Sequence, residues 1–146
     1  MYGDGDTTFQ AAGGEAGVRR LVESFYTLME TRPNYQPIWQ MHADAELDDA
    51  AAVERAGVVR RDKLARFLCA WMGGPKLFSE KYGPISIPNA HGHLHVSAAE
   101  RDLWLSCMAE ALASHDYPAD FVRYLLGALW VPAERIRELS SARHDL

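Results

Sequence analysis

The sequence predicts an all-α fold in a single domain, and three observations support this prediction. Apolar residues recur at helical spacing in four separate segments, as expected for amphipathic helices. No segment shows sustained alternation of apolar and polar residues bounded by turn residues, so strands are not expected. At 146 residues the chain has the length of one domain with one core. We therefore treat residues 1–146 as one domain.

The first long helix is expected between Gly13-Gly14 and Arg32-Pro33. Its inward face repeats over three turns, at Val18, Leu21, Val22, Phe25, Leu28 and Met29. The helix should end at Arg32, because a residue that precedes proline is pushed out of the α region. Residues 34–41 contain Pro37 among large apolar groups and predict a short irregular or 3₁₀ connection.

A second helix is expected over residues 58–72. Its apolar positions are Val59, Leu64, Phe67, Leu68 and Trp71, and Gly73-Gly74-Pro75 then stops it. The Ala-rich, acidic stretch 43–57 before this helix holds few large apolar groups, so we expect an extended, solvated loop there. Residues 75–90 contain several prolines and one glycine and are also expected to form a loop.

Two further helices complete the prediction. Ser97 followed by Glu100 is the pattern of a capping box, so a helix should begin there. Its inward positions are Leu103, Trp104, Cys107, Met108 and Ala111. Pro118 favours the start of a new helix, so the last helix is expected to start near Phe121. Pro132 should kink or divide it.

Composition excludes several classes of protein. The net charge of -5 repels a phosphate backbone, and Lys and Arg form no stripe, so nucleic acid is not an expected partner. No apolar run has the length of a membrane span, and the first residues lack the pattern of a secretory signal, so the cytoplasm is the expected location. Cys69 and Cys107 fall on apolar helix faces, and we expect both thiols to be buried and free.

The cluster His91-Gly92-His93-Leu94-His95 is the main candidate for chemistry, and it has three interpretations. On a strand, the three histidines would share one face and form a site for zinc or non-haem iron. In a loop, all three would be solvated. In a helix or loop beside a buried pocket, only one of them would face that pocket and ligate a cofactor metal.

Other residues favour the pocket interpretation. Tyr26 and Trp104 lie on inward helix stripes, and each aromatic ring carries a polar hydrogen-bond donor. A large flat cofactor such as haem needs an apolar slot, one imidazole ligand and a few donors aimed at the bound ligand. The predicted slot is lined by Phe25, Leu64, Phe67, Leu68 and Phe78.

Several motifs taken together resemble the group II truncated haemoglobins over residues 12–130. The matching segments are Gly13 to Ala16, Phe25-Tyr26, Gly73-Gly74-Pro75, and Glu100-Arg101-Asp102-x-Trp104-Leu105-x-Cys107-Met108. The spacings from Gly83 to His91 and from His91 to Trp104 also fit the family without a gap. The combination is specific, although each motif alone is weak.

The resemblance implies a two-over-two helical sandwich around haem b, with His91 as the proximal iron ligand. Tyr26, His42 and Trp104 would lie on the distal side. Tyrosine O–H and indole N–H both donate hydrogen bonds, which favours a ligand that gains negative charge on binding ferrous iron. The implied function is reversible binding of O₂, with NO and CO as further ligands, in a protein that is not a dedicated enzyme.

The chain departs from the family pattern around His91. Many relatives have an arginine just before the proximal histidine and a proline-phenylalanine pair just after it, whereas this chain has Ala90 before and Gly92-His93-Leu94 after. One expected partner of the haem propionates is therefore missing. Lys63, Arg60 or Arg61 are its candidate replacements. The register of the helix after the 43–57 loop leaves two alternatives open, in which Arg60 projects toward the distal entrance or Arg61 points to solvent.

Three other functions stay open at this level. A donor-rich haem pocket also suits NO oxidation or peroxide chemistry, for which an external reductase would be needed. A non-haem metal protein would use His91, His93 and His95, and a helical interaction module would need no cofactor at all. A second copy of the chain, forming a homodimer, is a further partner that the sequence allows.

Overall fold

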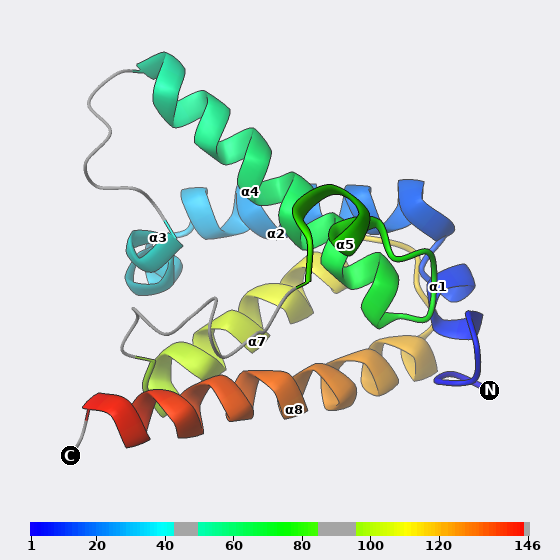
Figure 1. The fold of residues 1–146 in the computed structure, drawn as a ribbon. Helices are drawn as coiled ribbons and strands as arrows, with labels where there is room; N and C mark the ends of the chain where they lie inside the picture. The colour runs from blue at the N-terminus through cyan, green and yellow to red at the C-terminus, as the bar shows by residue number, and fades with distance from the viewer. Residues whose placement is uncertain (43–49, 85–95, 145–146) are drawn as a thin grey trace.

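A computed structural model describes residues 1–42, 50–84 and 96–144 of the chain (Figure 1). All regular secondary structure in these residues is helical, so the predicted fold class is confirmed. The elements are α1 (Thr7–Ala11), α2 (Gly14–Thr31), η1 (Pro33–Tyr35), α3 (Gln36–His42), α4 (Ala50–Trp71), α5 (Leu77–Tyr82), α7 (Ala98–Ala113) and α8 (Ala119–His144).

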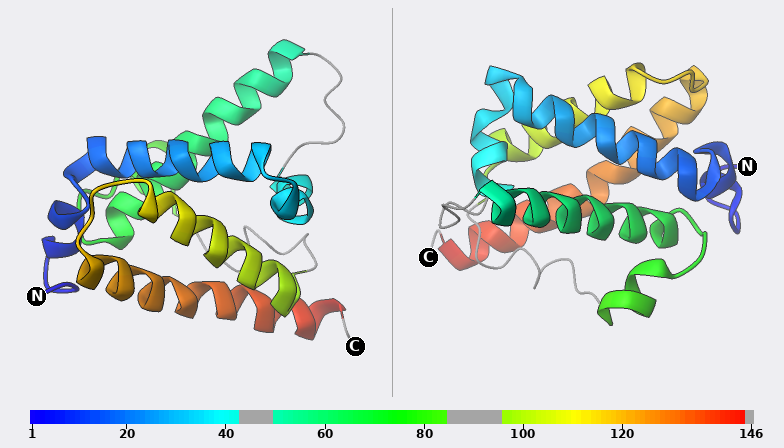
Figure 2. Two further views of the ribbon diagram at one scale, coloured as in Figure 1. Left: turned by 180° about the vertical axis from the view of Figure 1, so that it is seen from behind. Right: turned by 90° about the horizontal axis from the view of Figure 1, so that it is seen from above.

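The four long helices form two pairs, which Figures 1 and 2 show from three sides. Helix α2 packs along α4, and α7 packs along α8. Contact between α2 and α7 joins the two pairs, and the short helix α3 packs against both α2 and α7. The two chain termini lie at opposite ends of the molecule (Figure 1). This arrangement leaves one side of α4 facing the α7–α8 pair.

The core lies between α2 and its neighbours α4 and α7 and extends to α8, and the predicted inward positions of α2 belong to it. Val18, Leu21, Val22, Phe25 and Met29 are all buried, and Leu28 is partly buried. Each large side chain of this kind contributes about 1.5 to 3 kcal/mol by leaving water. Cys69 and Cys107 are buried and free, which confirms the expectation for both thiols.

Both predicted helix stops around α2 and α4 are correct. Arg32 has extended backbone angles (φ -91°, ψ 124°) immediately before Pro33, so α2 ends at Thr31. Gly73 follows α4 with a φ of +90°, a conformation that side chains with a Cβ rarely adopt. A Cβ at Gly73 would also lie 1.9 Å from the carbonyl oxygen of Gly5, so only glycine fits this turn.

Three loop predictions are wrong because short helices form where the apolar pattern is weak. The predicted 3₁₀ turn is present at Pro33–Tyr35 (η1), but Gln36–His42 then form the helix α3. Helix α4 begins at Ala50, eight residues before the expected start, because alanine favours helix even where no apolar face is present. Val53, Val58 and Val59 on these turns are exposed, so Val59 is not an inward residue. Residues 77–82 form α5, which packs on α4.

Two details of the last helices also differ from expectation. Ser97 is the N-cap of α7, as predicted, but its hydroxyl hydrogen-bonds the Glu100 carboxylate and makes no cap bond to a backbone N–H. Helix α8 begins at Ala119 and runs through Pro132 without being divided, since packing on α7 supports it across the hydrogen bond that proline cannot make. Among the helices that the structure describes, none combines the length and apolar character required to cross a bilayer.

Candidate functional site

Tyr26 and Trp104, the two predicted distal donors, are brought together by Phe25. The Phe25 ring packs edge-on against Trp104 with ring centroids 5.1 Å apart, and against Tyr26 with centroids 5.2 Å apart. The Cys107 thiol donates a hydrogen bond to the Phe25 carbonyl oxygen at 3.3 Å, which fixes α7 against α2 at this point. Tyr26 is buried and Trp104 is partly buried.

Tyr26 stays protonated in this environment. Burial raises the pKa of its hydroxyl far above the ordinary value, and the opposing effect of the cations Arg60 and Arg61 is smaller. A tyrosine that keeps its proton at neutral pH remains a hydrogen-bond donor. The side chain is therefore suited to donate to a ligand that carries negative charge.

The structure does not place Arg61 toward solvent, so that alternative is wrong. Its guanidinium lies over the Tyr26 ring, 5.3 Å from the ring centroid. It also forms ion pairs with Glu23 at 3.0 Å and with Glu30 at 2.9 Å, and its side chain is 22% exposed. Arg61 thus connects α4 to α2, and the carboxylates of Glu23 and Glu30 offset its positive charge.

Arg60 lies over Trp39, a residue that the sequence analysis did not select. The guanidinium carbon is 5.3 Å from the centroid of the Trp39 ring, and both side chains are partly buried. Trp39 belongs to α3, which was expected to be irregular, so no helical stripe marked it. The only available signal was a tryptophan within a short stretch of apolar residues.

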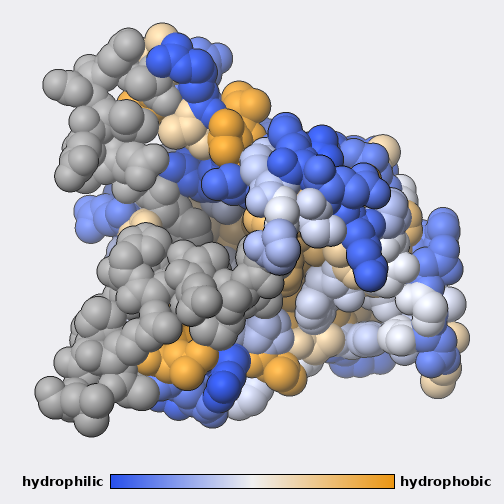
Figure 3. Space-filling model, viewed as in Figure 1, coloured by the Kyte–Doolittle hydropathy of each residue, from blue (hydrophilic) through white to orange (hydrophobic). Residues whose placement is uncertain are grey.

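The predicted apolar slot is only partly filled by the protein itself. Of the residues predicted to line it, Leu64 and Phe67 on α4 and Phe78 on α5 are partly exposed, whereas Phe25 and Leu68 are buried in the core. In the described ranges, α4 makes at most marginal contact with α7 and α8. Figure 3 shows hydrophobic side chains set back between the α4–α5 side and the α7–α8 side of this face. Large apolar groups left partly uncovered beside two donors fit a flat apolar cofactor such as haem.

The short helix α5 borders this slot and is held to α4 by Asp62. Phe78 on α5 packs against Tyr82, with ring centroids 5.1 Å apart. Tyr82 donates to the Asp62 carboxylate at 2.6 Å. The ammonium group of Lys63 lies 5.4 Å from the centroid of the Tyr82 ring, and in the part of the chain that is described it forms no ion pair.

Several predicted residues lie outside the described residues. These are His91, His93 and His95, together with the side chain of His42 at the end of α3 and residues 43–49 of the expected loop. Across residues 1–42, 50–84 and 96–144, no three His, Cys, Asp or Glu side chains are grouped so as to hold a metal ion.

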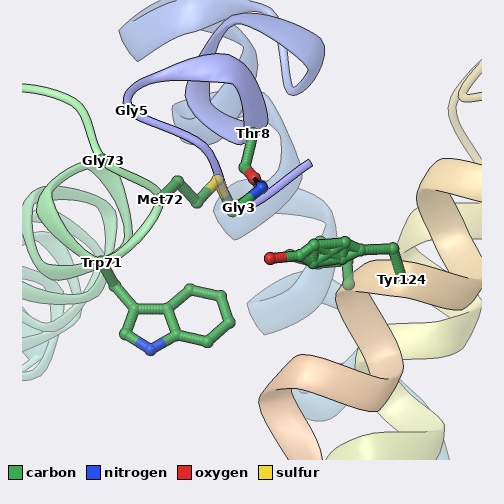
Figure 4. Close-up of a pocket in the computed structure, with 8 residues that line it drawn as sticks. Gly3, Gly5, Thr8, Trp71, Met72, Gly73 and Tyr124 are labelled. Carbon is green, nitrogen blue, oxygen red and sulfur yellow. Dashed lines mark hydrogen bonds between the residues drawn. The ribbon is translucent and has the colours of Figure 1, made fainter. Parts of the chain in front are cut away.

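A separate cavity of about 300 Å³ lies between the N-terminal segment, the end of α4 and α8 (Figure 4). Its lining includes Trp71, Met72 and Tyr124, and the Trp71 indole faces the Tyr124 ring across it. The Thr8 hydroxyl accepts a hydrogen bond from the Gly3 N–H at 2.8 Å beside the cavity. Its lining does not include Tyr26 or Trp104, so it is distinct from the predicted distal site.

Comparison with known proteins identifies the family. Residues 7–129 match the model of the bacterial-like globins. The chain is 27% identical over 123 residues to the group 2 truncated hemoglobin YjbI of Bacillus subtilis, covering 84% of this chain and 83% of that protein.

Solved structures agree with this match. A cold-adapted truncated hemoglobin of Pseudoalteromonas haloplanktis superimposes with a TM-score of 0.75 at 27% identity, over 89% of this chain and 96% of that one. A group II 2-on-2 hemoglobin of Agrobacterium tumefaciens gives a TM-score of 0.75 at 26% identity, over 94% and 98% of the two chains. The two-over-two fold is thereby confirmed, and the chain belongs to the bacterial-like globin family as a relative of its group II truncated haemoglobins.

Proposed function

We propose that this protein binds haem b, with His91 as the iron ligand, and reversibly binds O₂ beside Tyr26 and Trp104. The observation that supports this most directly is the meeting of these two donors around Phe25, next to apolar side chains that the protein leaves partly uncovered. Family membership implies haem binding, and the departures around His91 leave the histidine itself in place.

The roles of the distal residues follow from their chemistry. When bound, ferrous haem supplies an iron atom that takes up a diatomic ligand. Tyr26 stays protonated and donates its O–H, and Trp104 donates its indole N–H but accepts nothing. Donors in a site of low dielectric stabilise negative charge on a ligand more than they would in water. Bound O₂ gains more negative charge than NO or CO, so these hydrogen bonds should stabilise O₂ most.

Lys63 is the side chain best placed to replace the missing propionate partner. It lies next to Leu64 on the edge of the slot and is kept in place by the Tyr82 ring. Arg61, by contrast, is already committed to Glu23 and Glu30. A carboxylate at the rim of the slot would therefore meet an ammonium group that has no acidic partner among the described residues.

The proposed function is tested first by the absorption spectrum of the purified protein in its ferric, ferrous and CO-bound forms. We expect a strong Soret band that shifts on reduction and again on addition of CO. No Soret band, even after haem is added, would contradict haem binding. Metal analysis would then test zinc or iron at the three histidines.

We predict that Trp104→Phe speeds the dissociation of O₂ about tenfold, because one hydrogen bond of ~1.4 kcal/mol is lost while the ring packing on Phe25 is kept. The measurement is stopped-flow displacement of O₂ by CO. Trp130→Phe is the matched control, since Trp130 lies on α8 and is 46% exposed. An unchanged rate in Trp104→Phe would exclude a donor role for the indole.

A further inference from the structure

Arg60 and Trp39 form a contact close to Tyr26, because Arg60 directly precedes Arg61, whose guanidinium lies over the Tyr26 ring. Tyr26 is 4% exposed, whereas Arg60 and Trp39 are both partly exposed. The planar Arg60 guanidinium lies over the Trp39 indole at 5.3 Å from the ring centroid. Stacking of this kind restrains a long side chain and keeps its charge in one place. The positive charge is close enough to lower the pKa of the Tyr26 hydroxyl against the effect of burial.

The two arginines beside Tyr26 differ in how their charge is balanced. Arg61 forms ion pairs with Glu23 and Glu30, so its charge is largely neutralised. Arg60 forms no ion pair within the described residues, and its recorded partner there is the Trp39 ring. Arg60 is therefore the cation near Tyr26 whose charge is not offset by an ion pair among the described residues, in a protein whose overall net charge is -5.

We propose that Arg60, held over Trp39, is a specificity-determining residue that favours small anionic ligands, of the class of azide and nitrite, on the Tyr26 side of the haem slot. This inference rests on the proposed function, because such ligands need the haem iron. It goes beyond O₂ binding by naming the residue that favours anionic over neutral ligands.

The arrangement provides two successive interactions for an anion. A local positive charge raises the concentration of anions at the entrance and so raises the rate of association. The Tyr26 hydroxyl, which burial keeps protonated, and the Trp104 indole N–H can each donate a hydrogen bond to an anion. A neutral ligand such as CO gains nothing from the first interaction.

The direction in which salt changes the azide association rate of the wild-type protein is the first test. Salt screens charges, so a rate that depends on attraction falls as ionic strength rises, and a rate limited by repulsion increases. The net charge of -5 would repel azide and predicts an increasing rate. Control by Arg60 predicts a falling rate. The measurement is stopped-flow binding of sodium azide to the ferric haem protein at neutral pH over a series of salt concentrations.

Two variants then assign the effect to Arg60. We expect Arg60→Gln to slow azide association roughly threefold at low salt, through loss of one local charge, and to leave CO association to the ferrous form unchanged. Arg60→Lys keeps the charge and should retain most of the wild-type rate. Arg55→Gln removes the same charge from an exposed position on α4, away from Trp39, and should behave as wild type.

The outcomes separate this inference from the proposed function. A purified chain without a Soret band overturns both. A normal Soret band with azide association that increases with salt, or that is equally fast in Arg60→Gln, overturns only the role of Arg60. Equal changes in the azide and CO rates of Arg60→Gln would also overturn it, because they would indicate a steric effect. A falling salt dependence that disappears in Arg60→Gln and persists in Arg55→Gln supports the proposal.

Discussion

Replacing His91 by glycine is expected to lower haem affinity on the order of a hundredfold or more, because the proposed iron ligand is lost. Removing only a residue that hydrogen-bonds a metal ligand already costs metal sites about 10 to 100-fold in affinity. The slot would still hold the porphyrin by apolar contact with Leu64 and Phe67, so weak binding should persist. The measurement is a haem titration followed at the Soret band, together with transfer of haem to a competing apoprotein.

Added imidazole gives the specific readout for this prediction. It should enter the space left by the His91→Gly change and restore a histidine-type spectrum, which a merely unfolded variant would not show. His93→Gly and His95→Gly are the matched controls, because they remove neighbouring histidines of the same cluster. If either control lost haem while His91→Gly kept it without imidazole, the assignment of the ligand would be wrong.

The buried positions of α2 and α7 were predictable from sequence, because apolar residues recur at helical spacing in both segments. The inward positions of α2 are buried nearly without exception, and Cys107, Met108 and Ala111 of α7 are fully buried as expected. Tyr26 and Trp104 belong to these stripes. Their meeting around Phe25 therefore follows once α2 and α7 pack against each other.

The elements that sequence reasoning missed depend on tertiary contacts or on weak propensity. Helix α5 has six residues and no buried side chain, so no periodic pattern marks it, and its hydrogen bonds to Asp62 on α4 help to hold it. The first turns of α4 expose their valines, so an apolar pattern could not reveal them. The Arg60–Trp39 contact joins α4 to α3 and has no signature in sequence.

Asp62 is the second residue for which we expect a large effect, because it connects three helices. Its carboxylate, 15% exposed, accepts hydrogen bonds from four side chains on α2, α4 and α5: Arg19, Arg66, Lys81 and Tyr82. Burial alone would raise the pKa of this carboxyl, but the four hydrogen bonds outweigh burial and hold the pKa well below its ordinary value of 3.8.

We predict that Asp62→Asn lowers the free energy of unfolding by about 2 kcal/mol, because cations from two neighbouring helices lose their shared counter-charge. The loss is smaller than the about 3 to 5 kcal/mol of a fully buried pair, because Arg19 and Lys81 are 38% and 50% exposed and water screens them. Urea unfolding followed by circular dichroism measures it. Glu15→Gln is the control, since it removes an exposed carboxylate from the same Arg19 and should change stability little.

The stability difference between the wild type and Asp62→Asn should depend on pH. A carboxyl whose pKa is lower in the folded state stabilises the fold fully at pH values above its unfolded pKa, and the stabilisation is lost as the pH falls through the folded pKa. The wild-type protein should therefore lose its advantage over Asp62→Asn as the pH drops below about 4. A difference between the two proteins that stayed constant from neutral to strongly acidic pH would show that Asp62 acts through packing and not through its charge. Since α5 ends at Tyr82, shortly before the segment that contains His91, a charge-dependent anchor at Asp62 also implies that haem retention in the wild type weakens over the same acidic range.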